Sequence, residues 1–347
     1  MNGPLSRQLP AQDVEDLQHR VGVLWRHLDG GPILMTGCTG FFGAWMVEGL
    51  LAAVKHRRLS LEVVLLTRSC EEYQRRMPHV AGHPSVQLLE GDVRTFEAPP
   101  GSFTHLVLGA TTPSAALNLE SPRLMIDTIL EGTRRTLEVA SKAGVRHALF
   151  LSSGAVYGPQ PSDLLAFPET FGGAPDPLSR DAAYGLGKRL AEYLCGLIGR
   201  EEGMVMRIAR CFAFLGPHLP LGTHQAASSF LGDALAGRPI GVQGDGTAIR
   251  SWLYGKDLAW WLWTILLDER AGLLYNVGSD EVMDIAGLAR LVGRMAGQPV
   301  RIAARPEPGR PAHRYVPDVS RARNELGLEV SVPLEAAVQR TLQWNLA

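Results

Sequence analysis

The sequence has little cysteine, no long uninterrupted hydrophobic run and no excess of charge of either sign. Its four cysteines, Cys38, Cys70, Cys195 and Cys211, form no CxxC pair and have no histidines at ligand spacing, which argues against a disulfide framework and a metal site. The longest apolar run, roughly Leu258–Leu267, is shorter than the ~20 residues of a membrane helix. With 34 Lys and Arg against 35 Asp and Glu, the basic excess of nucleic-acid binders is missing. We therefore expect no metal, no membrane and no nucleic-acid partner.

The remaining composition is that of a globular protein, with 46% hydrophobic and 20% charged residues in 347. This length predicts about two domains, or one large α/β unit with an appendage. Residues 1–12 mix Pro, Ser, Arg, Gln and Asp, which is not a signal-peptide pattern, and we expect a cytoplasmic protein. Apolar residues at helical spacing over 13–28 predict a helix with Asp13 as N-cap. We interpret residues 1–31 as a helical extension that packs on the domain after it.

Short apolar runs then alternate with helical stretches. Such alternation is typical of βαβ units, whose parallel strands are buried on both faces and therefore read as continuous apolar runs. The sequence predicts an α/β fold, a Rossmann-type doubly wound parallel sheet, over residues 32–200. The predicted strands lie at 33–35, 61–66, 86–89, 105–108 and 148–151, and the helices at 42–55, 120–142 and 182–198.

Beyond residue 200 the pattern changes, because proline and glycine residues separate shorter predicted helices and strands. Residues 201–347 predict mainly a smaller C-terminal α+β lobe that holds the substrate. Segments such as 204–216 and 250–270 are expected to return to the first domain. Within the lobe we expect helices at 226–236 and 284–296 and strands at 239–243 and 273–277.

Three glycines stand between the first predicted strand and the first helix. Gly37 permits a tight turn, Gly40 lets the backbone approach a pyrophosphate, and Gly43 lets the helix pack on the sheet. The N-terminus of the helix then offers free N–H groups to phosphates. This placement predicts a dinucleotide site. The second strand is followed by Arg68 rather than an acidic residue, which favours NADP over NAD and leaves NAD as the alternative.

A second pattern carries acid–base chemistry. Tyr184 and Lys188 form YxxxK, and residues four apart share one face of a helix. A phenol with a pKa near 10 is a poor base at neutral pH, and a nearby ammonium favours the phenolate. We expect Lys188 to lower the pKa of Tyr184 and to hold the ribose of the cofactor.

These motifs resemble the extended branch of the short-chain dehydrogenase/reductase superfamily, the nucleotide-sugar epimerases and dehydratases. TGCTGFFG resembles its TGxxGFxG turn, and SSGAVYG its SSxxVYG segment, where Ser153 takes the place of the catalytic Ser or Thr. The resemblance implies that the substrate oxygen is oriented by Ser153. It also assigns cofactor contacts to Gly37, Thr39, Gly40, Phe41, Phe42, Gly43, Arg68, Asp92, Val93, Ala110, Thr111, Tyr184, Lys188 and Phe212.

Two departures from the family bear on the reaction and the substrate. The resemblance places an Asp or Glu of the 4,6-dehydratases and UDP-glucuronate decarboxylases where this chain has Gly154 and Ala155, which disfavours both reactions. Ala213 replaces an asparagine that holds substrate in the family. Arg250 matches the arginine that holds the diphosphate of a nucleotide sugar, and one of Arg305, Arg310 and Arg314 is a candidate second clamp.

The sequence thus predicts an NAD(P)-dependent oxidoreductase or epimerase of a nucleotide-activated sugar, with catalytic Ser153, Tyr184 and Lys188. A reductase of another small alcohol or ketone is the alternative, and a non-catalytic NAD(P)-binding sensor is a third reading. The resemblance also implies a homodimer through the helices at 120–142 and 182–198, where Leu124, Leu130, Leu137, Leu190 and Leu194 are the apolar candidates.

Overall fold

A seven-stranded parallel sheet forms the centre of the computed structural model, which describes residues 7–111 and 115–347. Its strand order, β11-β6-β5-β4-β1-β2-β3, confirms the doubly wound arrangement, because the chain moves outward from β1 in both directions. All six strand pairs are parallel. The strands are β1 (Ile33–Thr36), β2 (Val63–Thr67), β3 (Val86–Glu90), β4 (His105–Leu108), β5 (His147–Ser153), β6 (Val205–Cys211) and β11 (Leu274–Val277).

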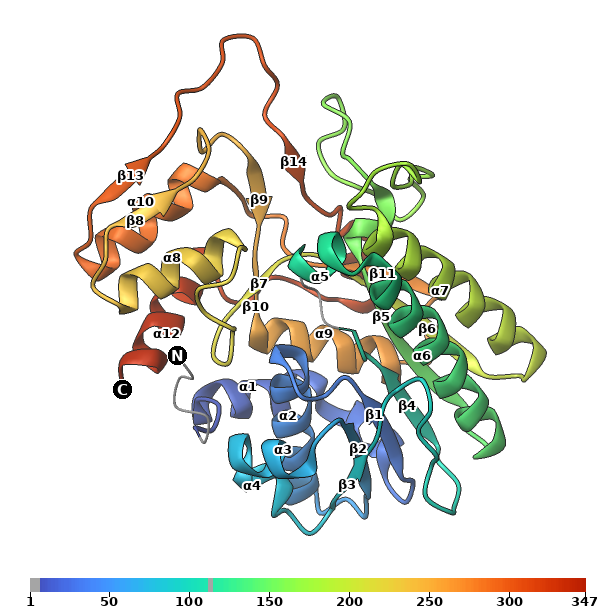
Figure 1. The fold of residues 1–347 in the computed structure, drawn as a ribbon. Helices are drawn as coiled ribbons and strands as arrows, with labels where there is room; N and C mark the ends of the chain where they lie inside the picture. The colour runs from blue at the N-terminus through green and yellow to red at the C-terminus, as the bar shows by residue number, and fades with distance from the viewer. Residues whose placement is uncertain (1–6, 112–114) are drawn as a thin grey trace.

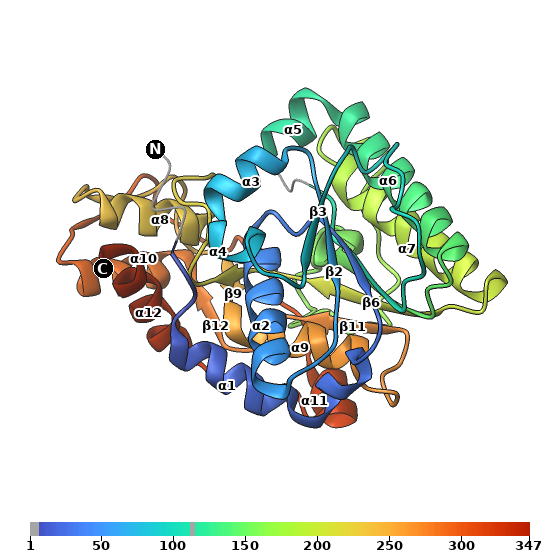
Figure 2. The same cartoon turned by 90° about the horizontal axis from the view of Figure 1, so that it is seen from below.

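Helices cover both faces of this sheet, as Figures 1 and 2 show. On one face lie α1 (Ala11–Val21), α2 (Phe41–Arg57) and α9 (Gly255–Leu267), and on the other α6 (Pro122–Lys142) and α7 (Ala183–Glu201). Alternate residues of one strand point to opposite faces. Met35 of β1 therefore packs in the core under α2 and α9, whereas Leu34 packs in the core under α6 and α7.

The segment at 273–277, expected in the smaller lobe, instead joins the main sheet. Its strand β11 pairs with β6 in register, with Tyr275 opposite Ala209. The prediction was wrong because a four-residue strand after proline- and glycine-rich sequence carries no sign of its partner. The run before it, Leu258–Leu267, belongs to α9, which is buried over its whole length. The indole of Trp263 donates to the Met46 carbonyl at 3.2 Å.

The C-terminal elements form small sheets with helices around them, as the sequence predicted. In one sheet β9 (Ile249–Ser251) lies between β12 (Val282–Asp284) and β14 (Arg314–Tyr315). The other two-stranded sheets pair β8 (Ile240–Val242) with β13 (Val300–Ile302) and β7 (Phe214–Leu215) with β10 (Leu253–Tyr254). The remaining helices are α3 (Cys70–Arg76), α4 (Pro78–Ala81), α5 (Ala115–Glu120), α8 (Ala226–Leu235), α10 (Ile285–Ala296), α11 (Ser320–Leu326) and α12 (Leu334–Leu346), with 3₁₀ turns η1 (Gly22–Leu28) and η2 (Gly154–Tyr157).

The N-terminal extension is tied to the core by a buried carboxylate. Asp13 does not cap α1, because the helix begins at Ala11, after Pro10. Instead its two oxygens accept hydrogen bonds from the Tyr254 hydroxyl at 2.7 Å and from Arg340 at 2.6 Å. The expectation of an N-cap was therefore wrong, and Asp13 joins the first helix to α12 near the C-terminus. In the described ranges, no helix combines the length and hydropathy needed to span a bilayer.

Candidate active site

The glycine turn between β1 and α2 is shaped by close packing at two of its three glycines. Gly37 has φ 72°, and a Cβ there would lie 2.1 Å from the carbonyl carbon of Gly109. A Cβ on Gly43 would lie 1.9 Å from the Cys38 carbonyl oxygen. Gly40 differs, because a Cβ there would meet no protein atom within 4 Å. The packing of the chain therefore does not require a glycine at position 40, and the space beside it is open.

This open space lies where α2 begins. Gly40 is the N-cap residue, no side chain caps the helix, and its first turn has no acidic residue. The first N–H groups of a helix lack intrahelical partners and carry a partial positive charge. The turn also lies between β1 and β4, the switch point of the sheet, where doubly wound proteins bind their ligands. The residues present therefore fit the pyrophosphate of a dinucleotide.

The other expected cofactor contacts lie at the carboxyl ends of neighbouring strands. Arg68 is exposed directly after β2, and Asp92 follows β3. Arg94 donates to both oxygens of Asp92, at 2.9 and 2.7 Å, and lowers the pKa of that carboxyl to about 2. After β4, the Thr111 hydroxyl donates to the Ala110 carbonyl at 2.7 Å. Asp92 is therefore a permanent anion beside Arg68, which contributes to lowering its pKa.

The hydroxyls of Ser153 and Tyr184 meet where β5 ends and α7 begins. The Ser153 oxygen accepts a hydrogen bond from the Ala155 N–H at 3.2 Å. Ser153 lies close enough to Tyr184 to oppose the effect of burial, which raises the pKa of the phenol. Asn118 holds the start of α7, because its side-chain oxygen accepts from the Tyr184 N–H at 2.8 Å and its amide donates to the Asp181 carbonyl. The sequence did not identify Asn118, which lies on a six-residue helix without a recognisable motif.

Lys188 lies one turn further along α7 and is 3% exposed. Its ammonium donates to the Leu151 carbonyl at 2.8 Å and lies 4.8 Å from the ring centroid of Phe150. Burial lowers the pKa of Lys188 to about 8 and raises the pKa of Tyr184 to about 12, against the opposing effect of the nearby Ser153. The expectation that Lys188 lowers the pKa of Tyr184 does not describe this arrangement. Burial has the largest effect on the pKa of Tyr184, and the ammonium of Lys188 is bonded to the Leu151 carbonyl instead.

A buried ion pair supports this site from behind. Arg210 donates to both oxygens of Glu192, with the shortest contact at 2.6 Å, and Ser152 donates to the same carboxylate at 2.5 Å. The guanidinium lies over the ring of Tyr157, whose hydroxyl donates to Asn276. Glu192 was missed by sequence reasoning, although its position four residues after Lys188 places both on one helix face. The network holds β5, β6 and α7 together below Ser153.

A second tyrosine reaches the catalytic hydroxyls from the C-terminal part of the chain. Burial raises the pKa of Tyr315, and the nearby Ser153 opposes this effect. A Cβ on Gly154 would lie 2.6 Å from the Tyr315 hydroxyl oxygen and 2.8 Å from the ring of Phe212. No sequence pattern identifies Tyr315, because β14 is only two residues long and its partner strand is distant in the chain. Residue 154 is therefore enclosed by aromatic side chains.

Arg250 lies on the strand next to Tyr315. It is half-buried, its guanidinium carbon lies 5.9 Å from the centroid of the Tyr315 ring, and it donates to the carbonyls of Ile249 and His313 at 2.8 and 3.1 Å. Within residues 7–111 and 115–347, Arg250 forms no ion pair with an acidic residue. Its positive charge is therefore not neutralised by the chain, as a clamp for a phosphate requires.

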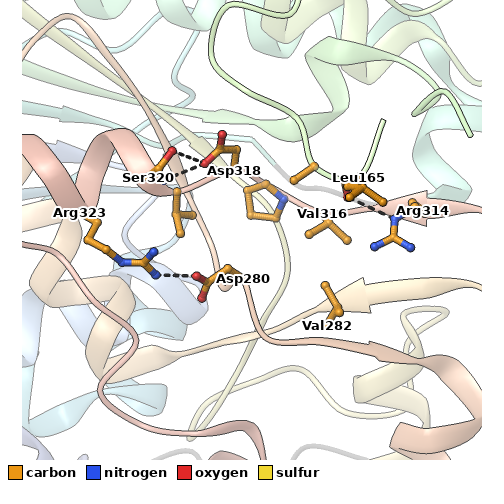
Figure 3. A pocket seen from close by; sticks show the side chains of 11 residues that line it. Leu165, Asp280, Val282, Arg314, Val316, Asp318, Ser320 and Arg323 are labelled. Atoms are coloured by element: carbon orange, nitrogen blue, oxygen red, sulfur yellow. Dashed lines mark hydrogen bonds and ion pairs between the residues drawn. The ribbon is translucent and has the colours of Figure 1, made fainter. Parts of the chain in front are cut away.

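The three other candidate arginines lie elsewhere on the lobe. Arg305 and Arg310 are exposed, and Arg310 pairs with Glu307 at 3.3 Å. Arg314 donates to the Leu165 carbonyl at 3.2 Å and lines a cavity of about 220 Å³ (Figure 3). Since Arg314 and Tyr315 are consecutive on a strand, their side chains point to opposite faces. The cavity is thus on the far side of β14 from Ser153.

Comparison with known proteins places the chain in a family. Residues 33–278 match the NAD dependent epimerase/dehydratase family. The chain belongs to this family. A UDP-glucuronic acid decarboxylase 1 of Xenopus tropicalis is 28% identical over 91% of this chain and 72% of its own length. A UDP-glucuronic acid decarboxylase 6 of Arabidopsis thaliana is 30% identical over 87% of this chain and 85% of its own.

Solved structures show the same fold at lower sequence identity. The epimerase Mth375 of Methanothermobacter thermautotrophicus aligns with a TM-score of 0.79 and 21% identity, covering 94% of this chain and 95% of its own. The dTDP-glucose 4,6-dehydratase DesIV of Streptomyces venezuelae, solved with NAD bound, aligns with a TM-score of 0.76 and 23% identity, covering 90% and 96%. The prediction of the family, an NAD-dependent epimerase/dehydratase family, is confirmed.

Proposed function

We propose that the protein transfers a hydride between a nicotinamide cofactor and a ring carbon of a nucleotide-activated sugar, as a ketoreductase or as an epimerase through a keto intermediate. The observation that carries the proposal is that Ser153, at the end of β5, lies close enough to Tyr184, at the start of α7, to change the pKa of its phenol. A hydroxyl pair of this kind can exchange a proton with an alcohol or ketone oxygen. It needs no further acid or base for that step.

The residues take separate roles in this reaction. When bound, the nicotinamide supplies or accepts the hydride, and Gly40 with the start of α2 holds its pyrophosphate. Tyr184 removes the proton of the sugar hydroxyl during oxidation and returns it during reduction. Ser153 orients the reacting oxygen, and Lys188, 3% exposed, holds the cofactor ribose. A positioned proton transfer of this type contributes about 10²–10⁴-fold to the rate.

Decarboxylation of UDP-glucuronate is the second candidate, because relatives named as decarboxylases match most of the chain. Gly154 and Ala155 argue against it. Neither side chain can accept or donate a proton, and the space beside Gly154 is filled by Tyr315 and Phe212. We therefore favour reactions that need proton exchange only at the oxidised oxygen.

A substrate panel tests the proposal. The protein is mixed with each of NAD, NADP and their reduced forms and with UDP-, dTDP-, GDP- and CDP-sugars, including UDP-glucuronate. The readouts are the absorbance of the reduced nicotinamide, the mass of the product and the chromatographic separation of the product from the substrate, which detects an epimer. We expect either an epimer of unchanged mass or a product that differs by two hydrogens. Release of carbon dioxide or water at a useful rate would overturn the reading of residues 154 and 155, and no turnover of any sugar would overturn the proposal.

Two matched arginine variants test the nucleotide part of the substrate. Arg250→Gln removes the charge beside Tyr315, and we expect at least a tenfold rise in KM, which corresponds to about 1.4 kcal/mol of binding. Arg314→Gln removes a charge from the opposite face of the same small sheet and should leave KM unchanged. Equal KM values for both variants would contradict the role of Arg250.

A further inference from the structure

Tyr184 lies in the first turn of α7, where the backbone of a helix is held least firmly. The helix begins at Ala183, its N-cap residue Ala182 has a side chain that cannot accept a hydrogen bond, and the first turn carries no acidic residue. The first N–H groups of a helix have no partner within the helix, and helix ends fray. The place of the Tyr184 backbone therefore depends on a partner from outside α7.

Asn118 supplies this partner from another helix. Its side-chain oxygen accepts a hydrogen bond from the Tyr184 N–H at 2.8 Å, and its side-chain nitrogen donates to the Asp181 carbonyl at 2.5 Å. An N–H can only donate and a carbonyl can only accept, so a single orientation of the Asn118 amide satisfies both neighbours. The two ends of this amide thus hold the backbone on both sides of the point where α7 begins.

We propose that Asn118 is a positioning residue of the catalytic site, which fixes the backbone of Tyr184 and thereby the place of its phenol relative to Ser153. This inference rests on the proposed roles of Ser153 and Tyr184 and adds no catalytic group to them. Ser153 lies on β5 and Tyr184 on α7, so their separation depends on how the start of α7 is held. A misplacement of about 1 Å in an active site can slow a reaction about 10²-fold.

The segment before α7 is held mainly by hydrogen bonds to itself. Residues 176–181 are all exposed. The Ser179 N–H donates to the Asp176 carbonyl at 3.0 Å, and the Ala182 N–H donates to the Ser179 carbonyl at 3.3 Å. The bond from Asn118 to the Asp181 carbonyl differs, because it joins residues 63 positions apart. It ties this exposed segment to the helices that cover the sheet.

The later turns of α7 are held by other contacts. A Cβ on Gly187 would lie 3.0 Å from a side chain of α6, and the Lys188 ammonium donates to the Leu151 carbonyl at 2.8 Å. Loss of the Asn118 side chain should therefore displace Tyr184 and leave Lys188, the expected ligand of the cofactor ribose, in place. The expected effect is on the rate of the reaction and not on dinucleotide binding.

The position of Asn118 in the chain places it between the cofactor and the proton carrier. Asn118 lies on α5, the first helix after β4, and the carboxyl end of β4 precedes the expected cofactor contacts Ala110 and Thr111. In Figure 1, α5 lies at the end of α6 and α7 where both helices begin. A short helix next to one expected cofactor segment is thus bonded to the backbone of Tyr184.

The first test compares Asn118→Ala with Asn118→Asp. Alanine removes both hydrogen bonds, whereas a carboxylate still accepts from the Tyr184 N–H and is favourable at a helix N-terminus. With a sugar that the panel shows to be turned over, we expect the kcat of Asn118→Ala to fall at least about tenfold, with unchanged KM for sugar and dinucleotide. Asn118→Asp should stay within about threefold of the unaltered protein. Equal losses of kcat in the two variants would overturn the inference.

Glu281→Ala is the matched control, because Glu281 supports the start of α12 from a distant part of the chain in the same way. Its carboxylate accepts from the Leu334 N–H at 2.8 Å. Both alanine variants should lower the melting temperature, and only Asn118→Ala should lower kcat. If kcat falls as far in Glu281→Ala as in Asn118→Ala, Asn118 acts through stability alone and the inference is wrong.

Hydrogen exchange at the Tyr184 amide needs no substrate and therefore separates this inference from the proposed function. The exchange is followed by NMR in the unaltered protein, Asn118→Ala and Glu281→Ala. We expect the Tyr184 amide to exchange at least about tenfold faster in Asn118→Ala alone, because the start of α7 opens more often. An unchanged exchange rate would overturn the inference. Faster exchange, combined with a sugar panel without turnover, would overturn the proposed function and leave the support of Tyr184 by Asn118 established.

Discussion

Gly40→Ala separates the binding role of the glycine turn from its structural role. The added Cβ meets no protein atom within 4 Å, and the residue has φ −104°, which alanine adopts without strain. Alanine is a slightly poorer N-cap than glycine, which lowers stability. It also restricts the unfolded chain, which raises the free energy of unfolding by about 0.4–1 kcal/mol. These effects nearly cancel, so we expect the free energy of unfolding to change by less than about 0.5 kcal/mol.

The same methyl group enters the space that a pyrophosphate needs. We expect the affinity for NAD and NADP, measured by calorimetry, to fall at least about tenfold, or about 1.4 kcal/mol. Gly43→Ala is the contrasting control, because its Cβ would lie 1.9 Å from a backbone oxygen. That variant should lose stability in urea unfolding. Unchanged dinucleotide affinity in a stable Gly40→Ala protein would refute the placement of the pyrophosphate.

Three further predictions concern specificity, pH and assembly. Arg68→Asp should weaken NADP binding more than NAD binding, and equal affinity changes would exclude its role at the 2′-phosphate. Burial lowers the pKa of His105 from 6.5 to about 4, so the folded state binds fewer protons between these values. The free energy of unfolding is therefore unaffected by His105 above pH 6.5 and falls by up to about 3 kcal/mol as the pH drops to 4. His105→Gln should make the urea midpoint depend less on pH over this range. An unchanged pH dependence would contradict the assignment. Leu124 on α6 and Leu190 on α7 are 43% and 48% exposed, as a helix-mediated dimer interface requires. Light scattering should show a dimer that Leu190→Arg dissociates. A monomer at micromolar concentration would exclude this interface.

Much of the fold could be predicted because the sheet is parallel and buried on both faces. Its strands are therefore short apolar runs, and β1, β2, β3, β4 and β5 lie within two residues of the expected positions. The strand β11 could not be assigned in the same way. Its pairing with β6 is decided by packing of residues far apart in the chain, and a four-residue strand carries no pattern for its neighbour.

The candidate catalytic residues on β5 and α7 could be selected from the sequence because their spacing is local to one strand end and one helix. Ser153, Tyr184 and Lys188 belong to motifs, and Ser153 lies close enough to Tyr184 to lower the pKa of its phenol. Tyr315 was not predictable, since it reaches the site from the opposite end of the chain on a two-residue strand. The pKa of Tyr184 could not be predicted from the sequence either. Burial has the largest effect on it, and the spacing of residues does not reveal burial.

The central claim is that Tyr184 carries the proton exchanged with the sugar. The direct measurement is a single-turnover experiment with the Tyr184→Phe variant, loaded with oxidised dinucleotide and mixed with a sugar that the unaltered protein accepts. We predict that reduction of the nicotinamide slows by at least about 10²-fold, while dinucleotide affinity stays unchanged because the glycine turn is intact. A Tyr184→Phe protein that reduces the nicotinamide at the full rate would contradict the assignment of the active site.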